Sequence, residues 1–420
     1  MENTRQETSS ASSPRRRLLA GIGVALALTI LVAAGAHGAM TMNLFAPSSS
    51  CLACHNGLTS PDGQDISFGN NWRPTMMANA ARDPYWHASV RREIMEHPGA
   101  EAAIEEECSP CHMPMSSTEE RAAGKTGVVL AHLAAGAPGG PLAAMALDGV
   151  SCAACHRIGP EGLGSKATFT GRYKVTATPP PAVAPVYGPF KVEPGLARIM
   201  RSATGFEPRE SEHIQGAALC ASCHTLFTHA LGPDGKVLGS LAEQVPYLEW
   251  KHSDYNEAQS CQDCHMPTVD QAVPVSSVLG QPRQEVSLHQ FRGGNILIPR
   301  MLGKLRTELG VEALPQELDA QVKRTVDHLQ SEAASLAIKS VRLEGETLEA
   351  QVEVGNRAGH KLPTAYPSRR VWLRLRITGE AGKEIFASGV LADSGAIKGN
   401  DNDEDPTRFD RRLATLAALA

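Results

Sequence analysis

The sequence predicts a mainly α-helical and irregular domain, followed by a small immunoglobulin-like β-sandwich module that is either complete or truncated. Three observations predict this fold class. All ten cysteines lie in five Cys-x-x-Cys-His motifs between residues 51 and 265. The motifs are unevenly spaced, and glycine- and proline-rich stretches such as residues 179–189, which we expect to be loops, lie between them. Beyond residue 339 apolar and polar residues alternate, as they do in half-buried strands.

These patterns divide the chain of 420 residues into four parts. Residues 1–40 predict a signal peptide or N-terminal membrane anchor, and residues 45–295 a domain that carries the five motifs. Residues 296–338 predict a helical linker, and residues 339–420 the β-rich module. The formal charge of -5, with 40 basic and 45 acidic residues, offers no basic surface for nucleic acid, so nucleic acid is not expected as a partner.

The first 40 residues predict export. Three arginines at positions 15 to 17 precede residues 18–36, which carry no charge. Basic residues before an apolar run keep the N-terminus inside and send the following chain outward. An uncharged run of this length suits both a cleaved signal peptide and a membrane attachment through residues 18–36. We therefore expect a location that is either periplasmic or outward-facing and membrane-anchored.

The five motifs predict covalent attachment of haem c. They are, in chain order, Cys51-Leu-Ala-Cys54-His55, Cys108-Ser-Pro-Cys111-His112, Cys152-Ala-Ala-Cys155-His156, Cys220-Ala-Ser-Cys223-His224 and Cys261-Gln-Asp-Cys264-His265. In such a motif both thiols form thioethers with the haem vinyl groups, and the adjacent histidine becomes the proximal ligand of the iron. The sequence therefore predicts five haem c groups.

Zinc sites and redox dithiols also use paired cysteines, but neither requires a histidine directly after the second cysteine. With 15 histidines in 420 residues, five such coincidences have a chance probability of roughly one in ten million. An exported chain also places the thiols where haem attachment occurs. Haem attachment is thus the favoured interpretation at all five motifs.

The second axial ligand of each iron is less clearly marked. His213, His252 and His289 are the preferred distal candidates, because two of them precede a motif closely and the third is followed by two glycines that admit a flat ring. Weaker candidates are His87, His97, His132 and His360, with His229 weaker still. A thioether from Met76 or Met77 is a further alternative. For any single histidine, the competing interpretation is a solvated or hydrogen-bonded side chain.

Residues 50–295 resemble the cytochrome c-552/554 type of multihaem cytochrome. The resemblance is carried by the five motifs, by Cys-His-Met-Pro at residues 111–114 and 264–267, and by the stretch from Ser211 to His224. It implies a histidine upstream of Leu-Cys-x-x-Cys-His, which His213 and Leu219 match. It also implies an electron carrier, although related folds carry nitrite and hydroxylamine chemistry. Pentahaem nitrite reductases typically bind their catalytic haem through Cys-x-x-Cys-Lys, which this chain lacks.

The C-terminal part predicts a helix and then strands. Residues 315–338 carry apolar residues at the spacing of one helix face, and residues 348–354 and 371–377 alternate as strands do. A turn at residues 379–382 leads into a further strand at residues 384–387. Gly359-His360-Lys-Leu-Pro-Thr, followed by Arg370 and Trp372, resembles a C-terminal module of many multihaem cytochromes.

Two functions remain open on the sequence. The first is electron transfer outside the cytoplasm, with redox partner proteins or membrane quinol-linked electron donors as partners. The second is a redox enzyme that acts on a small nitrogen or oxygen compound at one haem with an open coordination position. Because no motif singles out such a haem, an electron carrier is favoured over an enzyme and no catalytic residue is assigned.

Overall fold

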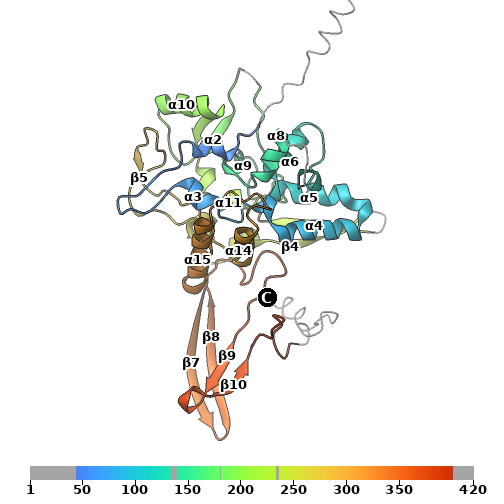
Figure 1. Ribbon diagram of the computed structural model, residues 1–420, viewed down its shortest axis with the longest axis vertical. Helices are drawn as coiled ribbons and strands as arrows, with labels where there is room; N and C mark the ends of the chain where they lie inside the picture. Colours follow the sequence, from blue (N-terminus) through green and yellow to red (C-terminus); the bar gives the residue numbers. More distant parts are fainter. Residues whose placement is uncertain (1–43, 134–139, 180, 233–235, 401–420) are drawn as a thin grey trace, which may run out of the picture.

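The computed structural model describes residues 44–133, 140–179, 181–232 and 236–400 (Figure 1). Its α-helices are α2 (Ser48–Leu52), α3 (Phe68–Trp72), α4 (Pro84–Glu96), α5 (Glu101–His112), α6 (Pro114–Ala122), α7 (Leu130–Leu133), α8 (Pro141–Leu147), α9 (Cys152–His156), α10 (Pro194–Thr204), α11 (Ala217–Cys220), α12 (Pro246–Lys251), α13 (Cys261–His265), α14 (Leu297–Lys304) and α15 (Pro315–Ser331). Single 3₁₀ turns are η1 (Ala80–Arg82), η2 (Pro98–Ala100), η3 (Glu212–Gln215) and η4 (Glu380–Gly382). The predicted helices and irregular connections are present between residues 45 and 295, but the strand pairs between residues 185 and 283 were not predicted.

Strands occur in pairs throughout the described residues. They are β1 (Pro185–Gly188), β2 (Glu207–Glu210), β3 (Leu226–Leu231), β4 (Val237–Gln244), β5 (Val273–Pro274), β6 (Pro282–Arg283), β7 (Ala334–Glu344), β8 (Thr347–Asn356), β9 (Leu375–Thr378) and β10 (Glu384–Ser388). Pairs β3–β4, β5–β6, β7–β8 and β9–β10 are antiparallel, whereas β1 and β2 pair in parallel. The prediction of a loop at residues 179–189 is wrong for β1, because its partner lies about twenty residues further along the chain and leaves no local signal.

Helix α4 begins at a side-chain cap. The carboxylate of Asp83 accepts hydrogen bonds from the backbone N–H groups of Tyr85 and Trp86, and Pro84 occupies the first helical position. Both features favour a helix start, because the first N–H groups of a helix have no partner within it. Helix α4 carries Trp86, whose indole is buried against the second motif.

We expect Asp83→Ala to lower the free energy of unfolding by about 1 kcal/mol, because two backbone donors lose their acceptor. Asp83→Ser keeps a capping oxygen and should lose only a few tenths of that amount. Urea denaturation followed by far-ultraviolet circular dichroism measures both variants. Equal losses for the two variants would show that the cap does not stabilise the helix.

The protein part of the core is divided into small clusters. Each of the five clusters in the described residues holds only four to six buried residues. Four of them include residues of a motif or residues close after one, such as Ala153, Ala221 and Met113. Domains of this size normally share one contiguous core. The fragmentation leaves the motifs beside small separate apolar patches, one of which the fourth and fifth motifs share, and it suits a domain whose interior is completed by large flat apolar groups.

Two helices connect this region to the C-terminal strands. Helix α14 packs against α15, and Leu302 and Leu318 bury their side chains in the contact. The predicted helix over residues 315–338 is confirmed as far as Ser331. From Ala334 the chain is strand β7 instead, because residues 334–338 pair with the end of β8. A cross-strand partner distant in sequence thus overrides the helical spacing at this end.

The C-terminal strands form two hairpins in the described residues. Hairpin β7–β8 extends away from the helical region (Figure 1), and β9–β10 follows as a second pair. The strand predicted over residues 348–354 and the strand after the turn at 379–382 are confirmed. The strand predicted over residues 371–377 begins only at Leu375. The two hairpins are separate two-stranded sheets, so the immunoglobulin-like sandwich stays a prediction.

No helix among the described residues has the length and hydropathy needed to cross a membrane. The segment for which a signal peptide or anchor is predicted, residues 1–40, lies outside the described part of the chain.

Candidate haem-binding sites

Each motif forms a helical turn. The second, third and fifth motifs lie at the end of α5 and within α9 and α13, and each ends its helix with the histidine. In the first and fourth motifs the histidine N–H donates to the carbonyl of the first cysteine, at 3.0 Å for His55 and 2.9 Å for His224. Residues four apart lie on one face of a helix. The turn therefore places the first thiol and the imidazole on the same side.

Four of the five motif imidazoles donate a hydrogen bond from Nδ1 to a main-chain carbonyl. His55 donates to Val275 at 2.6 Å, His112 to Ala80 at 3.1 Å, His156 to Tyr187 at 2.6 Å, and His265 to Arg292. A carbonyl oxygen can only accept, so the proton lies on Nδ1 and Nε2 keeps its lone pair. This hydrogen bond orients ligating histidines in metal sites generally. All four imidazoles are therefore prepared to bind iron through Nε2.

Burial favours the neutral form of four motif imidazoles, those of His112, His156, His224 and His265. It lowers the pKa of His112 and of His265 to about 4, and it also lowers the pKa of His156 and His224. A protonated imidazole has no lone pair for a metal, so neutral rings are the form that iron requires. The Trp86 indole stacks on the His112 ring at 4.2 Å with an interplanar angle of 2° and fixes its orientation from one side.

Six of the ten motif thiols have a raised pKa, whereas hydrogen bonds with a cysteine of another motif lower the pKa of Cys51 and Cys261. Burial raises the pKa of the Cys108 thiol to about 12 and of the Cys155 thiol to about 11. Reactive thiols need a lowered pKa, which electropositive surroundings supply. Among the described residues, no three His, Cys, Asp or Glu side chains converge to hold a metal ion by themselves. Paired thiols, one neutral imidazole and an adjacent apolar patch fit haem c better than zinc or a dithiol.

The motifs lie close together, although up to two hundred residues separate them in sequence. The thiol of Cys51 in the first motif forms a hydrogen bond with Cys152 in the third, and Cys111 in the second motif forms one with Cys223 in the fourth. Cys220 of the fourth motif is similarly paired with Cys261 of the fifth. These contacts bring sulfurs of different motifs side by side.

The fourth motif is the junction of this arrangement. The pKa values of Cys220 and Cys223 are raised mainly by their hydrogen bonds to other cysteines and by burial. Cys155 of the third motif lies close enough to both thiols to raise their pKa further. His224 likewise adds to the lowering of the pKa of His112 and His265, of which burial is the main cause. The first motif thus adjoins the third, and the fourth adjoins the second, third and fifth.

The three preferred distal candidates lie in different environments. His289 is half-buried between Phe68 and Phe291, and its ring centre is 6.2 Å from that of His156, with an interplanar angle of 12°. Its Nδ1 donates to the carbonyl of Ser287 at 3.1 Å, and burial lowers its pKa to about 3. The structure thus brings His289 to the third motif with Nε2 available.

The other two preferred candidates differ from His289. Both ring nitrogens of His213 are hydrogen-bonded, Nδ1 to the Ser211 hydroxyl at 2.7 Å and Nε2 to the carbonyl of Ile158 at 2.9 Å. His252 is exposed at the C-terminal end of α12. The distal role of His213, His252 and His289 stays a prediction.

Most of the weaker candidates have polar partners. His87 hydrogen-bonds to the carbonyl of Ala81, His132 to Glu120, and His229 to Glu107. His360, in contrast, lies in the C-terminal part of the chain and yet its ring is 6.3 Å from that of His265. The sequence carries only a weak signal for His360 as a ligand, because only the fold brings residues 265 and 360 together. The carbonyl partners of the motif histidines carry no sequence signal at all.

No family model matches this chain, and a search of curated proteins found none that is similar to it. A search of solved structures found a likeness to the crystal structure of a penta-heme cytochrome c552 from Thermochromatium tepidum, with 17% sequence identity and a TM-score of 0.49. The match covers 83% of this chain and 75% of that chain. At this identity and TM-score, the likeness establishes neither a family nor a function.

Proposed function

We propose that this chain carries five covalently bound haem c groups, one at each motif, and transfers electrons outside the cytoplasm. The observation that carries the proposal is the repeated geometry of the motifs: a helical turn with two thiols and an imidazole that, in four of five cases, is oriented through Nδ1 by a main-chain carbonyl. Haem iron supplies one-electron chemistry when it is bound.

In this proposal the residues of the chain hold, orient and order the five groups. Cysteines 51 and 54, 108 and 111, 152 and 155, 220 and 223, and 261 and 264 provide the attachment sulfurs, and the five motif histidines provide the proximal nitrogens. Contacts between Cys51 and Cys152, between Cys111 and Cys223 and between Cys220 and Cys261 favour short steps between neighbouring groups. A connected set of redox groups is what an electron carrier needs.

The proposal includes partners and a location. We infer that the chain exchanges electrons with redox partner proteins or with membrane quinol-linked donors, because a carrier needs both a donor and an acceptor. Thioether attachment takes place outside the cytoplasm, and the basic and apolar pattern of residues 15–36 is that of exported chains. A periplasmic or outward-facing, membrane-anchored protein is consistent with both.

We expect purified, fully matured protein to contain five haems per chain. The pyridine haemochrome spectrum gives the haem content, and intact mass gives the number of attached groups. A variant with Cys51→Ala and Cys54→Ala should contain four, because thioether attachment needs the thiols. His97→Ala changes an exposed histidine outside the motifs and should still contain five.

A wild-type chain with fewer than five haems, or one that binds zinc in their place, would contradict the proposal. Electron paramagnetic resonance separates electron transfer from the enzymatic alternative. A carrier should show low-spin iron at most of its sites. One high-spin site that binds cyanide, together with turnover of nitrite or hydroxylamine, would favour the redox enzyme instead.

A further inference from the structure

We infer that His360 supplies the second axial ligand of the iron at the fifth motif, opposite His265, so that the C-terminal module completes the coordination of a haem held by the N-terminal domain. This inference rests on the proposed function, since it requires haem at Cys261 and Cys264. It assigns His360, one of the weaker distal candidates in the sequence, to the iron of one particular motif.

The spacing of the rings suits a shared iron. Two imidazoles on opposite sides of one metal have ring centres about 6 Å apart, given a metal–nitrogen bond of about 2.0 Å on each side and the distance from nitrogen to ring centre. The rings of His265 and His360 are 6.3 Å apart with an interplanar angle of 14°. Two rings in face-to-face contact would lie about 4 to 5 Å apart, as the Trp86 and His112 rings do at 4.2 Å.

The hydrogen bonding of His360 leaves the correct nitrogen available. Nδ1 of His360 lies 2.9 Å from the carbonyl oxygen of Lys361, so the proton is on Nδ1 and Nε2 carries the lone pair. The same bond to a main-chain carbonyl is formed by four of the motif histidines and by His289. His360 is half-buried.

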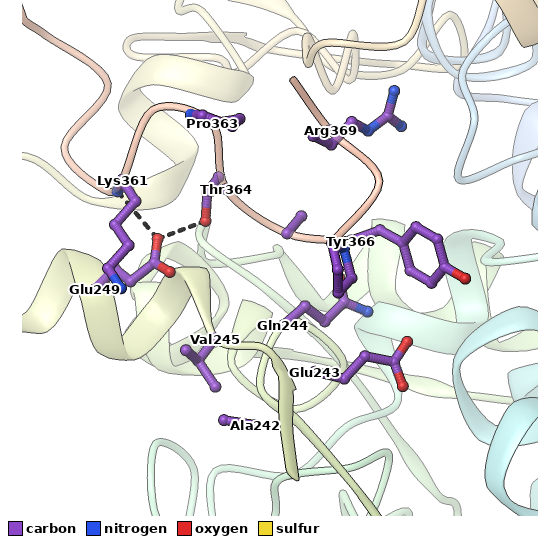
Figure 2. A pocket seen from close by; sticks show the side chains of 12 residues that line it. Ala242, Glu243, Gln244, Val245, Glu249, Lys361, Pro363, Thr364, Tyr366 and Arg369 are labelled. Carbon is purple, nitrogen blue, oxygen red and sulfur yellow. Dashed lines mark hydrogen bonds between the residues drawn. The ribbon is translucent and has the colours of Figure 1, made fainter. Parts of the chain in front are cut away.

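The loop that carries His360 is fixed to the N-terminal domain by Glu249 of helix α12. The Glu249 carboxylate accepts hydrogen bonds from the backbone N–H of Lys361 at 3.0 Å and from the hydroxyl of Thr364 at 2.5 Å. Figure 2 shows these two bonds in the cleft between the 361–369 loop and the end of β4. Helix α12 shortly precedes the fifth motif, so the anchor and the motif belong to one segment of the chain.

Three further contacts hold the chain around His360. The Asn356 side chain donates to the His360 carbonyl at 2.6 Å and accepts from the backbone N–H of Ala358 at 2.9 Å. Gly359 has a φ of +70° and lies against the ring of Tyr255, 3.4 Å from where a Cβ would be. A side chain at this position would be strained by the backbone conformation.

His328 of helix α15 is the competing ligand. Its ring is 6.1 Å from that of His265, with an interplanar angle of 55°. Its Nδ1 lies 3.2 Å from the Glu332 carboxylate, which also forms an ion pair with Arg292 at 2.8 Å. Nδ1 of His328 is buried and forms no hydrogen bond of normal geometry, whereas Nδ1 of His360 has the main-chain carbonyl partner that the motif histidines share.

The test compares full-length, matured wild-type protein with His360→Ala and His328→Ala. Haem content and mass are measured first. In the wild-type protein these two measurements test the proposed function. Both variants should still contain five haems per chain, because the thiols are intact. We then expect His360→Ala to convert one of the five haems from low spin to high spin in the electron paramagnetic resonance spectrum, and added imidazole to restore the low-spin signal. His328→Ala should leave the spectrum unchanged.

A second variant keeps the inference testable if His360→Ala does not fold. His360→Met should retain low-spin iron but raise the potential of one haem, because histidine–methionine ligation raises the potential relative to two histidines. Glu249→Ala, which removes the anchor of the loop, should give a partial high-spin fraction. The inference would be overturned if His328→Ala, and not His360→Ala, converted one haem to high spin. It would also be overturned if both His360 variants kept the wild-type spectrum and the wild-type potentials of all five haems. Either result would leave the five-haem proposal intact.

Discussion

Removing the fourth motif should slow electron movement through the chain more than removing any other. The contacts of Cys220, Cys223 and His224 join this motif to the second, third and fifth motifs. A variant with Cys220→Ala and Cys223→Ala should therefore leave the second and fifth motifs separated from the pair formed by the first and third. We expect complete reduction of its remaining haems to slow by about tenfold or more, equivalent to roughly 1.4 kcal/mol in the barrier.

The matched control removes the second motif through Cys108→Ala and Cys111→Ala. The second motif contacts the fourth motif, through Cys111 and Cys223 and through the proximity of His112 to His224. The first, third, fourth and fifth motifs should therefore stay connected when the second is removed. Both variants should contain four haems, which the pyridine haemochrome spectrum checks. Stopped-flow reduction by a soluble donor then measures the rates. Similar rates and phases in the two variants would show that the fourth motif is not a junction.

Arg157→Ala should cause a large loss of stability for a single substitution. Arg157 directly follows the third motif and is only 1% exposed. Its guanidinium donates to the carbonyl of Leu44 at 2.9 Å, to that of Thr176 at 3.0 Å, and to that of Pro185. The cation also lies 4.6 Å from the centre of the Phe206 ring. One side chain therefore connects three separate segments to the third motif.

Alanine at position 157 would leave the carbonyls of the buried residues Leu44 and Pro185, and that of the exposed Thr176, without this donor, together with a cavity. We expect the free energy of unfolding to fall by about 3 to 5 kcal/mol. Arg157→Lys keeps the charge but cannot reproduce the planar group of five donors, so about half of that loss should remain. Urea denaturation followed by circular dichroism measures both variants.

Arg342→Ala provides the control, because Arg342 forms exposed ion pairs with Glu344 and Glu349 on the β7–β8 hairpin. Its loss should cost less than about 0.5 kcal/mol. The prediction for Arg157 fails if Arg157→Ala and Arg342→Ala have the same stability.

Local patterns in the sequence predicted local structure well. The alternating apolar residues from 348 to 354 predict strand β8, and the turn at residues 379–382 predicts the following strand, β10. Both signals depend on neighbours within a few residues, which is the range over which backbone geometry fixes side-chain direction. The helix over residues 315–331 was predictable for the same reason.

The features that sequence reasoning missed depend on distant partners. Strand β1 forms only because β2 lies beside it, and its proline and glycine favour a loop when β1 is considered alone. The proximity of His360 to His265 depends on the Glu249 anchor, and the double hydrogen bonding of His213 depends on the carbonyl of Ile158. Neither contact has a periodicity or a motif that a linear pattern can reveal.

The Nδ1–carbonyl bonds of the motif histidines have a consequence for how these sites can be tuned. The acceptors are peptide groups at positions 80, 187, 275 and 292, so exchanging the side chain at any of them leaves the acceptor in place. Hydrogen bonding at Nδ1 increases the electron donation of the ring to its metal. Adjusting that donation therefore requires rerouting of the main chain, through loop length or a proline, and point substitutions that only swap side chains will largely preserve it.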